Sequence, residues 1–226
     1  QNTKYLLISL NTEHSFNDNW SIRHNLSYSR YTNTVSVLYP DSTAASNGDV
    51  NRYLWMDNAN GDDSTKNLYN SLELTGKFDT WNVRHTVLAG ADHSSRYEKA
   101  TWGELYSPPA GSDWSTNVFN PVYTAAPPTV TDADIYHVNT SMPWHGFYLQ
   151  DQMQLPYDVF VLAGLRYDHA SRSGITGTTN NLKPISSSSD SKVTPRFGVL
   201  WRPVQQLSFY GSYTENFGAS NGVDSS

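Results

Sequence analysis

Few residues in this sequence have the types and spacing that catalysis requires. Residues 218–222, Gly-Ala-Ser-Asn-Gly, match the pattern G-x-S-x-G, which in hydrolases places a nucleophilic serine on a sharp turn between a strand and a helix. Only four residues follow this segment, too few for a helix, so we expect a glycine-rich loop there and no catalysis. The sequence contains no cysteine, which excludes thiolate zinc sites and cysteine nucleophiles.

The seven histidines do not have the spacing of metal ligands. None of them forms an H-x-H or H-E-x-x-H pair, and we expect no metal site among them. Residues 57–63, DNANGDD, superficially resemble a calcium-binding loop, but Ala59 stands at a ligand position and no glutamate stands at the twelfth. We expect a solvated acidic loop instead. These observations predict a protein that is not an enzyme and that carries no cofactor.

Aromatic residues offer a different chemistry, the stacking of rings on a bound ligand. Several lie in or beside the stretch 103–142, which is rich in turn-forming residues and has no sustained period. Exposed amphipathic rings of this kind contact ligands at many binding sites, although they can also pack a long loop on itself. The candidate ligand-binding residues are Trp102, Tyr106, Trp114, Phe119, Tyr123 and Tyr136.

The composition excludes several classes of protein before any element is assigned. Of the 226 residues, 37% are hydrophobic and 16% are charged, both below the usual share, whereas 13% are aromatic and the net charge is only −6. This aromatic content does not fit a disordered chain. No apolar run approaches the ~18 residues of a membrane-spanning helix. No basic stripe marks a nucleic-acid surface, so we expect no nucleic-acid partner.

The elements that must position these residues are β-strands, because eight segments alternate apolar and polar residues with a period of two. In one of them, Ile22 and Leu26 fall on one side, whereas Arg23 and Asn25 fall on the other. The predicted strands span residues 4–16, 20–37, 66–78, 81–98, 144–155, 157–170, 192–202 and 207–217. Tight turns join them into four hairpins. The connecting stretches 39–65, 103–142 and 171–191 are expected to be loops.

This arrangement predicts an all-β fold, an antiparallel transmembrane β-barrel segment of about eight meandering strands. Short turns at one end and long loops at the other are typical of outer-membrane barrels, whereas soluble sandwiches have short turns at both ends. Charge placement agrees, because an arginine that faces lipid at the bilayer midplane costs roughly 2–4 kcal/mol. The residues that we expect to face the lumen, on the polar side of their strands, are Arg23, Arg84, Arg166, Asp168 and Arg196.

Aromatic residues also flank the tight turns, as Trp20 and Phe78 do, where a girdle at the level of the lipid headgroups is expected. Three polar residues do not fit the pattern. Asp151, His24 and His85 fall on the side that we expect to face lipid. A β-bulge could turn Asp151 away, but no bulge is visible in the sequence.

Four stretches in the second half of the chain resemble the barrel of TonB-dependent siderophore receptors. They are residues 144–152 (WHGFYLQDQ) followed by 162–168 (LAGLRYD), then 192–198 (KVTPRFG), and 207–217 (LSFYGSYTENF). In this order they form a fairly specific set, which strictly covers residues 144–217. The hairpins before them fit the layout of the family without a diagnostic motif.

This resemblance implies energised import of a ferric siderophore across the outer membrane of a bacterium, through a plugged barrel of about 22 strands. The implied partners are the ferric siderophore, the TonB complex and outer-membrane lipid, and iron enters only as part of the substrate. Residues 1–226 show no plug domain, no TonB-contacting segment and only eight strands. We therefore expect part of a barrel wall with its external loops, with both ends of the chain on the external side.

Two alternatives stay open at this point. The first is a small, complete eight-stranded outer-membrane barrel with a structural or adhesive role, which needs periplasmic termini and a filled lumen. The second is a soluble β-sandwich that binds glycans through exposed tryptophan and tyrosine side chains.

Overall fold

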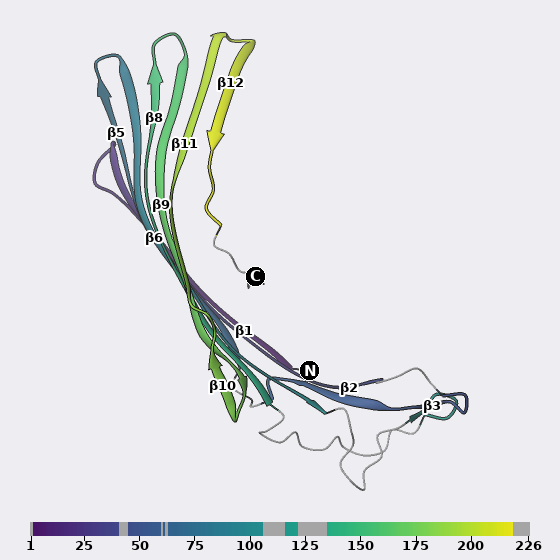
Figure 1. Cartoon of the computed structure of the whole chain (residues 1–226). Coiled ribbons are helices and arrows are strands. Elements are labelled where there is room, and N and C mark those ends of the chain that lie inside the picture. The colour runs from purple at the N-terminus through teal and green to yellow at the C-terminus, as the bar shows by residue number, and fades with distance from the viewer. Residues whose placement is uncertain are drawn as a thin grey trace.

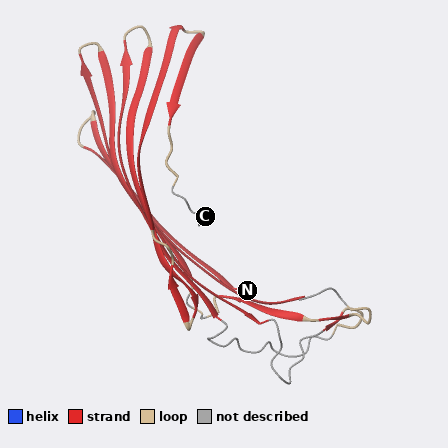
Figure 2. Ribbon diagram, viewed as in Figure 1, coloured by secondary structure: helices blue, strands red, loops and turns tan. Residues whose placement is uncertain are grey.

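The computed structural model describes residues 2–40, 45–59, 61, 63–105, 116–121 and 135–218. Figure 1 shows their long strands side by side in one strongly bent sheet. The secondary structure in these ranges consists of strands, loops and turns (Figure 2). No helix in the described part of the chain is long and apolar enough to cross a membrane.

The sheet is a meander of antiparallel strands. The long strands follow the order β1-β2-β5-β6-β8-β9-β11-β12, and each pairs with the next one in this order. β4 extends the sheet beyond β5 by pairing with β2 and β6, β10 pairs with β9, and β3 and β7 form a separate small sheet. The strands are β1 (Asn2–Ser15), β2 (Trp20–Pro40), β3 (Asp49–Val50), β4 (Arg52–Asp57), β5 (Ser64–Thr80), β6 (Val83–Leu105), β7 (Thr116–Asn117), β8 (Ile135–Leu155), β9 (Val159–Thr178), β10 (Asn181–Pro184), β11 (Ser188–Val204) and β12 (Leu207–Thr214).

The fold class expected from the sequence, an all-β antiparallel meander, is confirmed, but several strands are longer than expected. β6 continues to Leu105, β8 begins at Ile135 and β9 continues to Thr178, so parts of the expected loops 103–142 and 171–191 are strand. In parts of these extensions, such as residues 139–141 and 171–173, serine, threonine and asparagine interrupt the apolar alternation. Backbone hydrogen bonds do not need an apolar face, so the strands continue after the period-two signal ends.

Two other differences concern β4 and β12. β4 (Arg52–Asp57) lies inside the expected loop 39–65, where six residues were too short a run to stand out among turn-forming neighbours. β12 ends at Thr214, three residues before the expected end at residue 217. The chain then continues along the sheet, where the amide of Glu215 donates to the carbonyl of Pro195.

The register places the charged residues together on one face of the sheet. Cross-strand partners point to the same side, and one row of partners runs from Arg23 through Glu73, Gly90 and Tyr148 to Arg166. We call this side the polar face. It carries all the residues that we expected to share one side of the sheet: Arg23, Arg84, Arg166, Asp168 and Arg196.

The opposite side, which we call the apolar face, is exposed. The side chains of Phe147, Leu149 and Leu165 near the middle of the sheet remain 58%, 58% and 59% exposed. No second layer of described residues covers them, as a β-sandwich would require. β1 and β12 are not paired with each other within the described residues, so the described strands do not close into an eight-stranded barrel either. A large exposed apolar face of this kind marks a surface that meets lipid or a partner.

Bulky aromatic side chains stand at two of the tight turns. Trp81 and Tyr157 have backbone φ angles of 54° and 66°, in the left-handed region that bulky residues rarely adopt. Both side chains are more than 90% exposed. Rings that are apolar with a polar edge prefer the interface between lipid and water, which is a physical reason for their presence at exposed turns.

The polar residues that the sequence placed on the apolar face are paired with their neighbours, without a bulge. His85 Nδ1 lies 2.6 Å from Asp151 Oδ2, and the His85 ring stacks on Phe78 with centroids 4.9 Å apart. His24 Nε2 lies 2.9 Å from the side-chain oxygen of Asn70. Pairing lowers the cost of placing these groups beside lipid, although, among the described residues, only one of the two Asp151 carboxylate oxygens has a partner and the other, Oδ1, is buried without one.

We expect the pairing of His85 and Asp151 to appear as a coupling free energy. His85→Leu leaves the Asp151 carboxylate unpaired on the apolar face and should lower the free energy of unfolding by about 1–3 kcal/mol. The double variant with Asp151→Leu should lose less than the sum of the two single variants, by about 1 kcal/mol or more. Unfolding of the full-length protein in detergent, followed by heat-modifiable gel migration, measures all three. Met153→Leu is the control, and additive losses would contradict the pairing.

Candidate functional site: a polar network and an aromatic ledge

The polar face carries a network centred on Arg166 of β9. Its Nη1 and Nη2 donate to the two carboxylate oxygens of Asp92 at 2.7 and 3.0 Å. Its Nε lies 2.9 Å from both carboxylate oxygens of Asp168. Asp168 is buried, and its side chain is only 4% exposed. Such two-pronged contacts fix the guanidinium plane and leave neither carboxylate without a partner.

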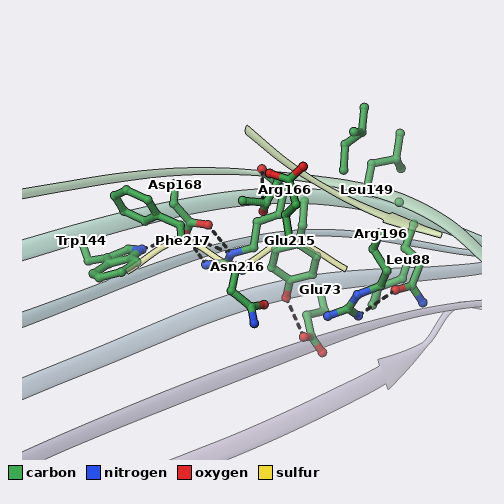
Figure 3. A pocket seen from close by; sticks show the side chains of 15 residues that line it. Glu73, Leu88, Trp144, Leu149, Arg166, Asp168, Arg196, Glu215, Asn216 and Phe217 are labelled. Atoms are coloured by element: carbon green, nitrogen blue, oxygen red, sulfur yellow. Dashed lines mark hydrogen bonds and ion pairs between the residues drawn. The ribbon is translucent and has the colours of Figure 1, made fainter. Parts of the chain in front are cut away.

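Two aromatic residues of β8, Trp144 and Tyr148, complete the network, and Figure 3 shows Trp144 beside Asp168. The Trp144 indole N–H donates to Asp168 at 2.7 Å, and the Tyr148 hydroxyl donates to Glu73 of β5 at 2.7 Å. The Arg166 guanidinium carbon lies 5.2 Å from the centroid of the Tyr148 ring, within the range of a cation–π contact. The network therefore links β5, β6, β8 and β9 through side chains as well as through the backbone.

Glycines make room for this network. A Cβ atom at Gly90 would collide with the ring of Tyr148, and one at Gly146 would collide with the guanidinium of Arg166. Both glycines are register partners of network residues, since Gly90 faces Tyr148 and Gly146 faces Asp168. A larger residue at either place would displace the side chain that crosses over it.

A hollow of about 430 Å³ lies beside the network, under the segment that follows β12. Phe217 packs edge-on against Trp144, with ring centroids 5.1 Å apart. Glu215 pairs with Lys192 at 3.0 Å, and Arg196 donates to the side-chain oxygen of Gln150 at 3.2 Å. Because these charged side chains have hydrogen-bond or ion-pair partners, this region is suited to rigid support of the wall and to polar contact with whatever fills the space beside it.

In the described ranges, no group of three or more histidine, aspartate or glutamate side chains could hold a metal ion. The segment with the G-x-S-x-G pattern begins at Gly218, and its serine lies outside the described residues.

A second feature of the polar face is a group of aromatic side chains at the end of the sheet away from the tight turns. Trp102 of β6 and Tyr136 of β8 are register partners, with ring centroids 4.5 Å apart. Tyr39 of β2 and Tyr53 of β4 stack with centroids 5.6 Å apart. The register places Trp55 of β4 on the same side, between these two pairs. We call these five residues the aromatic ledge.

The ledge contains two of the six aromatic residues that the sequence marked as candidates. Trp102 and Tyr136 lie in it, whereas Phe119 lies apart, next to the small β3–β7 sheet, and is 79% exposed. Tyr106, Trp114 and Tyr123 lie outside the described residues.

Tyr39, Tyr53 and Trp55 were not among the candidates that the sequence marked. Tyr53 and Trp55 lie in residues 52–57, RYLWMD, where aromatic and aliphatic residues alternate with the period of a strand, but this run of six residues is too short to stand out among its turn-forming neighbours.

A family model described as "TonB dependent receptor-like, beta-barrel" matches residues 1–226. Among curated proteins, the Ferrioxamine B receptor of Salmonella typhimurium is 27% identical over 228 residues, which cover 96% of this chain and 29% of that protein. The Ferrichrome outer membrane transporter/phage receptor of Escherichia coli is 26% identical, over 96% of this chain and 30% of that protein. The chain thus spans less than a third of the length of these relatives.

Solved structures show a similar fold. The siderophore receptor PiuA from Acinetobacter baumannii superposes with a TM-score of 0.64 at 18% identity, over 94% of this chain and 32% of that chain. The ferric-catecholate import receptor Fiu of E. coli superposes with a TM-score of 0.65 at 17% identity, over 97% of this chain and 35% of that chain.

We expect Arg166 to be much more important for stability than another arginine of the same face. Arg166→Met leaves the Asp92 and Asp168 carboxylates without their cation and should cost on the order of 2–3 kcal/mol of unfolding free energy. Arg84→Met breaks only an exposed contact with Asp79, at 3.6 Å, and should cost under about 0.5 kcal/mol. Thermal unfolding of the full-length protein in detergent compares the two variants. Equal losses would mean that the network does not stabilise the wall.

Proposed function

Because the chain belongs to the TonB-dependent receptor-like β-barrel family, we propose that it forms part of the wall and the outer loops of a barrel that imports a ferric siderophore across the outer membrane. The single observation that carries this proposal is the aromatic ledge, a set of aromatic side chains on the polar face at the loop end of a wall whose other face is apolar. The 27% identical Salmonella relative is a receptor for ferrioxamine B, which supports an iron chelate as the ligand.

The two faces of the sheet support this orientation. In the proposed barrel the tight turns point to the periplasm, the apolar face meets lipid, and the polar face lines the lumen. The apolar side of β9 runs without interruption from Val159 to Tyr167. At ~3.3 Å per residue and a tilt of about 40°, this stretch spans about 20 Å, close to the ~25 Å apolar band of such barrels.

The unpaired edges of the sheet support the proposal that the chain is part of a larger barrel. All residues of β1 are exposed, and its outer edge has no partner strand in the part of the chain that the structure describes. Open edges of this length are a liability in an isolated sheet. In the proposal, other parts of a longer protein supply the remaining strands, together with the plug that contacts the TonB complex.

The chemistry of import in this proposal is non-covalent. A chelate docks on the ledge, where Trp102 and Tyr136 provide two aromatic rings inclined at 35° to each other and the Tyr136 hydroxyl is held by a hydrogen bond from Thr176 at 3.0 Å. The Arg166 network lies deeper on the same face and keeps the wall rigid while the lumen opens. Iron is part of the cargo, and the wall needs no cofactor or catalytic group of its own.

We expect substitution of the ledge to weaken ligand binding. In the full-length receptor, Trp102→Ala combined with Tyr136→Ala should reduce the affinity for the ferric chelate about 10-fold, since ring stacking contributes roughly 0.5–1.5 kcal/mol per contact. Binding of ⁵⁵Fe-labelled ferrioxamine B and ferrichrome to cells without an energy source measures this. Trp81→Ala, at a tight turn on the opposite end, is the matched control and should bind normally.

One result would contradict docking of the chelate on the ledge, and another would contradict the proposed function. Normal binding by the ledge variant would show that the chelate docks elsewhere on the receptor. A full-length receptor that binds and imports no ferric chelate from a broad panel would refute the proposed function itself.

A further inference from the structure

Two histidines from neighbouring strands face each other on the apolar face, at the end of that face nearer the loops. His93 of β6 and His145 of β8 are direct register partners. Their ring centroids lie 4.6 Å apart, their ring planes are inclined at 29°, and their two Nδ1 atoms are 3.3 Å apart. The two residues are 52 positions apart in the sequence, so no local spacing of metal ligands could reveal the pair.

The distance between the two Nδ1 atoms fits a shared metal ion. A hydrogen bond between them is weak at best, because 3.3 Å is beyond the common ~2.9–3.0 Å and a neutral imidazole carries only one proton. Two nitrogens that each lie about 2.0–2.1 Å from a tetrahedral Zn²⁺ are about 3.3–3.4 Å apart. Because χ2 of histidine is a broad torsion, a small rotation of each ring directs both lone pairs to one ion.

His169 of β9 comes next in the same register row, but its ring is already held. Its Nδ1 lies 2.8 Å from the hydroxyl oxygen of Ser191. Among the described residues, no group of three histidine, aspartate or glutamate side chains could hold a metal ion, so water completes the coordination of an ion on His93 and His145. His145 is exposed, which gives the ion a path from solvent.

The side chains around the pair determine which class of ion fits. On the same face, Ala91 and Phe147 are the neighbours toward the tight turns, and Ser95 and Pro143 are the neighbours toward the loops. These four residues bring no cation that would repel a metal ion and no carboxylate that would favour Mg²⁺ or Ca²⁺. A site built from imidazole nitrogens selects ions such as Zn²⁺, Cu²⁺ and Ni²⁺.

We propose that His93 and His145 form a binding site for a divalent transition-metal ion, with Zn²⁺ as the representative ligand. The ion coordinates both Nδ1 atoms, each ring carries its proton on Nε2, and β6 is joined to β8 through side chains as well as through the backbone. An ion that binds only the folded barrel stabilises it. The pair lies on the face opposite the aromatic ledge and the Arg166 network, so the site is independent of the proposed import function.

Binding of Zn²⁺ to the tag-free full-length receptor in detergent, measured by isothermal titration calorimetry, tests the site. We expect His93→Gln and His145→Gln each to lower the Zn²⁺ affinity at least about 10-fold, because the second ligand acts at a high effective concentration. The matched control is His137→Gln, a histidine on the same face of β8 whose Nε2 lies 2.9 Å from the Thr179 hydroxyl, and it should bind as the parent does. Mg²⁺ should not compete.

Two further measurements separate ligation from an effect on the fold. The electron paramagnetic resonance spectrum of Cu²⁺ on the parent should show coupling to two imidazole nitrogens, and that of either single variant to one. Zn²⁺ should raise the temperature at which the parent and His137→Gln lose heat-modifiable migration, and it should leave that of His145→Gln unchanged.

Equal Zn²⁺ affinity of the parent and both single variants would overturn the site. A loss in His137→Gln as large as in the other variants would also overturn it, in favour of unspecific binding to surface histidines. If His93→Gln does not form a heat-modifiable barrel, His145→Gln, at an exposed position, decides alone.

Discussion

Backbone hydrogen bonds between neighbouring strands set the register of the sheet, and the register decides which environment each side chain meets. The rest of the structure depends on this constraint. A shift of one residue in β9 would turn Arg166 and Asp168 toward the apolar face and Leu165 toward the polar one. Among the described residues, every long strand except β1 and β12 pairs with a neighbour on both sides, so two neighbours set the register of each inner strand.

Polar groups near the apolar face are tolerated because neighbouring strands supply their partners. His85 and Asp151 come from β6 and β8 and meet at 2.6 Å, beside the ring of Phe78. On the polar face the same principle works on a larger scale, where Arg166 joins two carboxylates from β6 and β9. In both places the cost of removing a charge from water is offset by a fixed partner at short range.

The strands pass through three environments along their length. Aromatic rings stand at the tight turns, and apolar residues form the middle of one face. On the loop side of the register partners His93, His145 and His169, the strands continue with more polar residues. These extensions carry the aromatic ledge. The ledge is therefore held by the same hydrogen-bonded sheet that forms the wall, so its geometry does not depend on a free loop.

The sequence alone determined the features that depend on local geometry. Side chains alternate along any strand, so the period of two indicated the strands and their two faces. It also placed Arg166 and Asp168, two residues apart, on the same face. Only the tertiary structure decided which distant residues meet: Asp92 is 74 residues from Arg166, and Tyr53 reached the ledge through a strand too short to recognise. The physical reason is that backbone pairing sets register and strand length, and it leaves no periodic signal in polar segments.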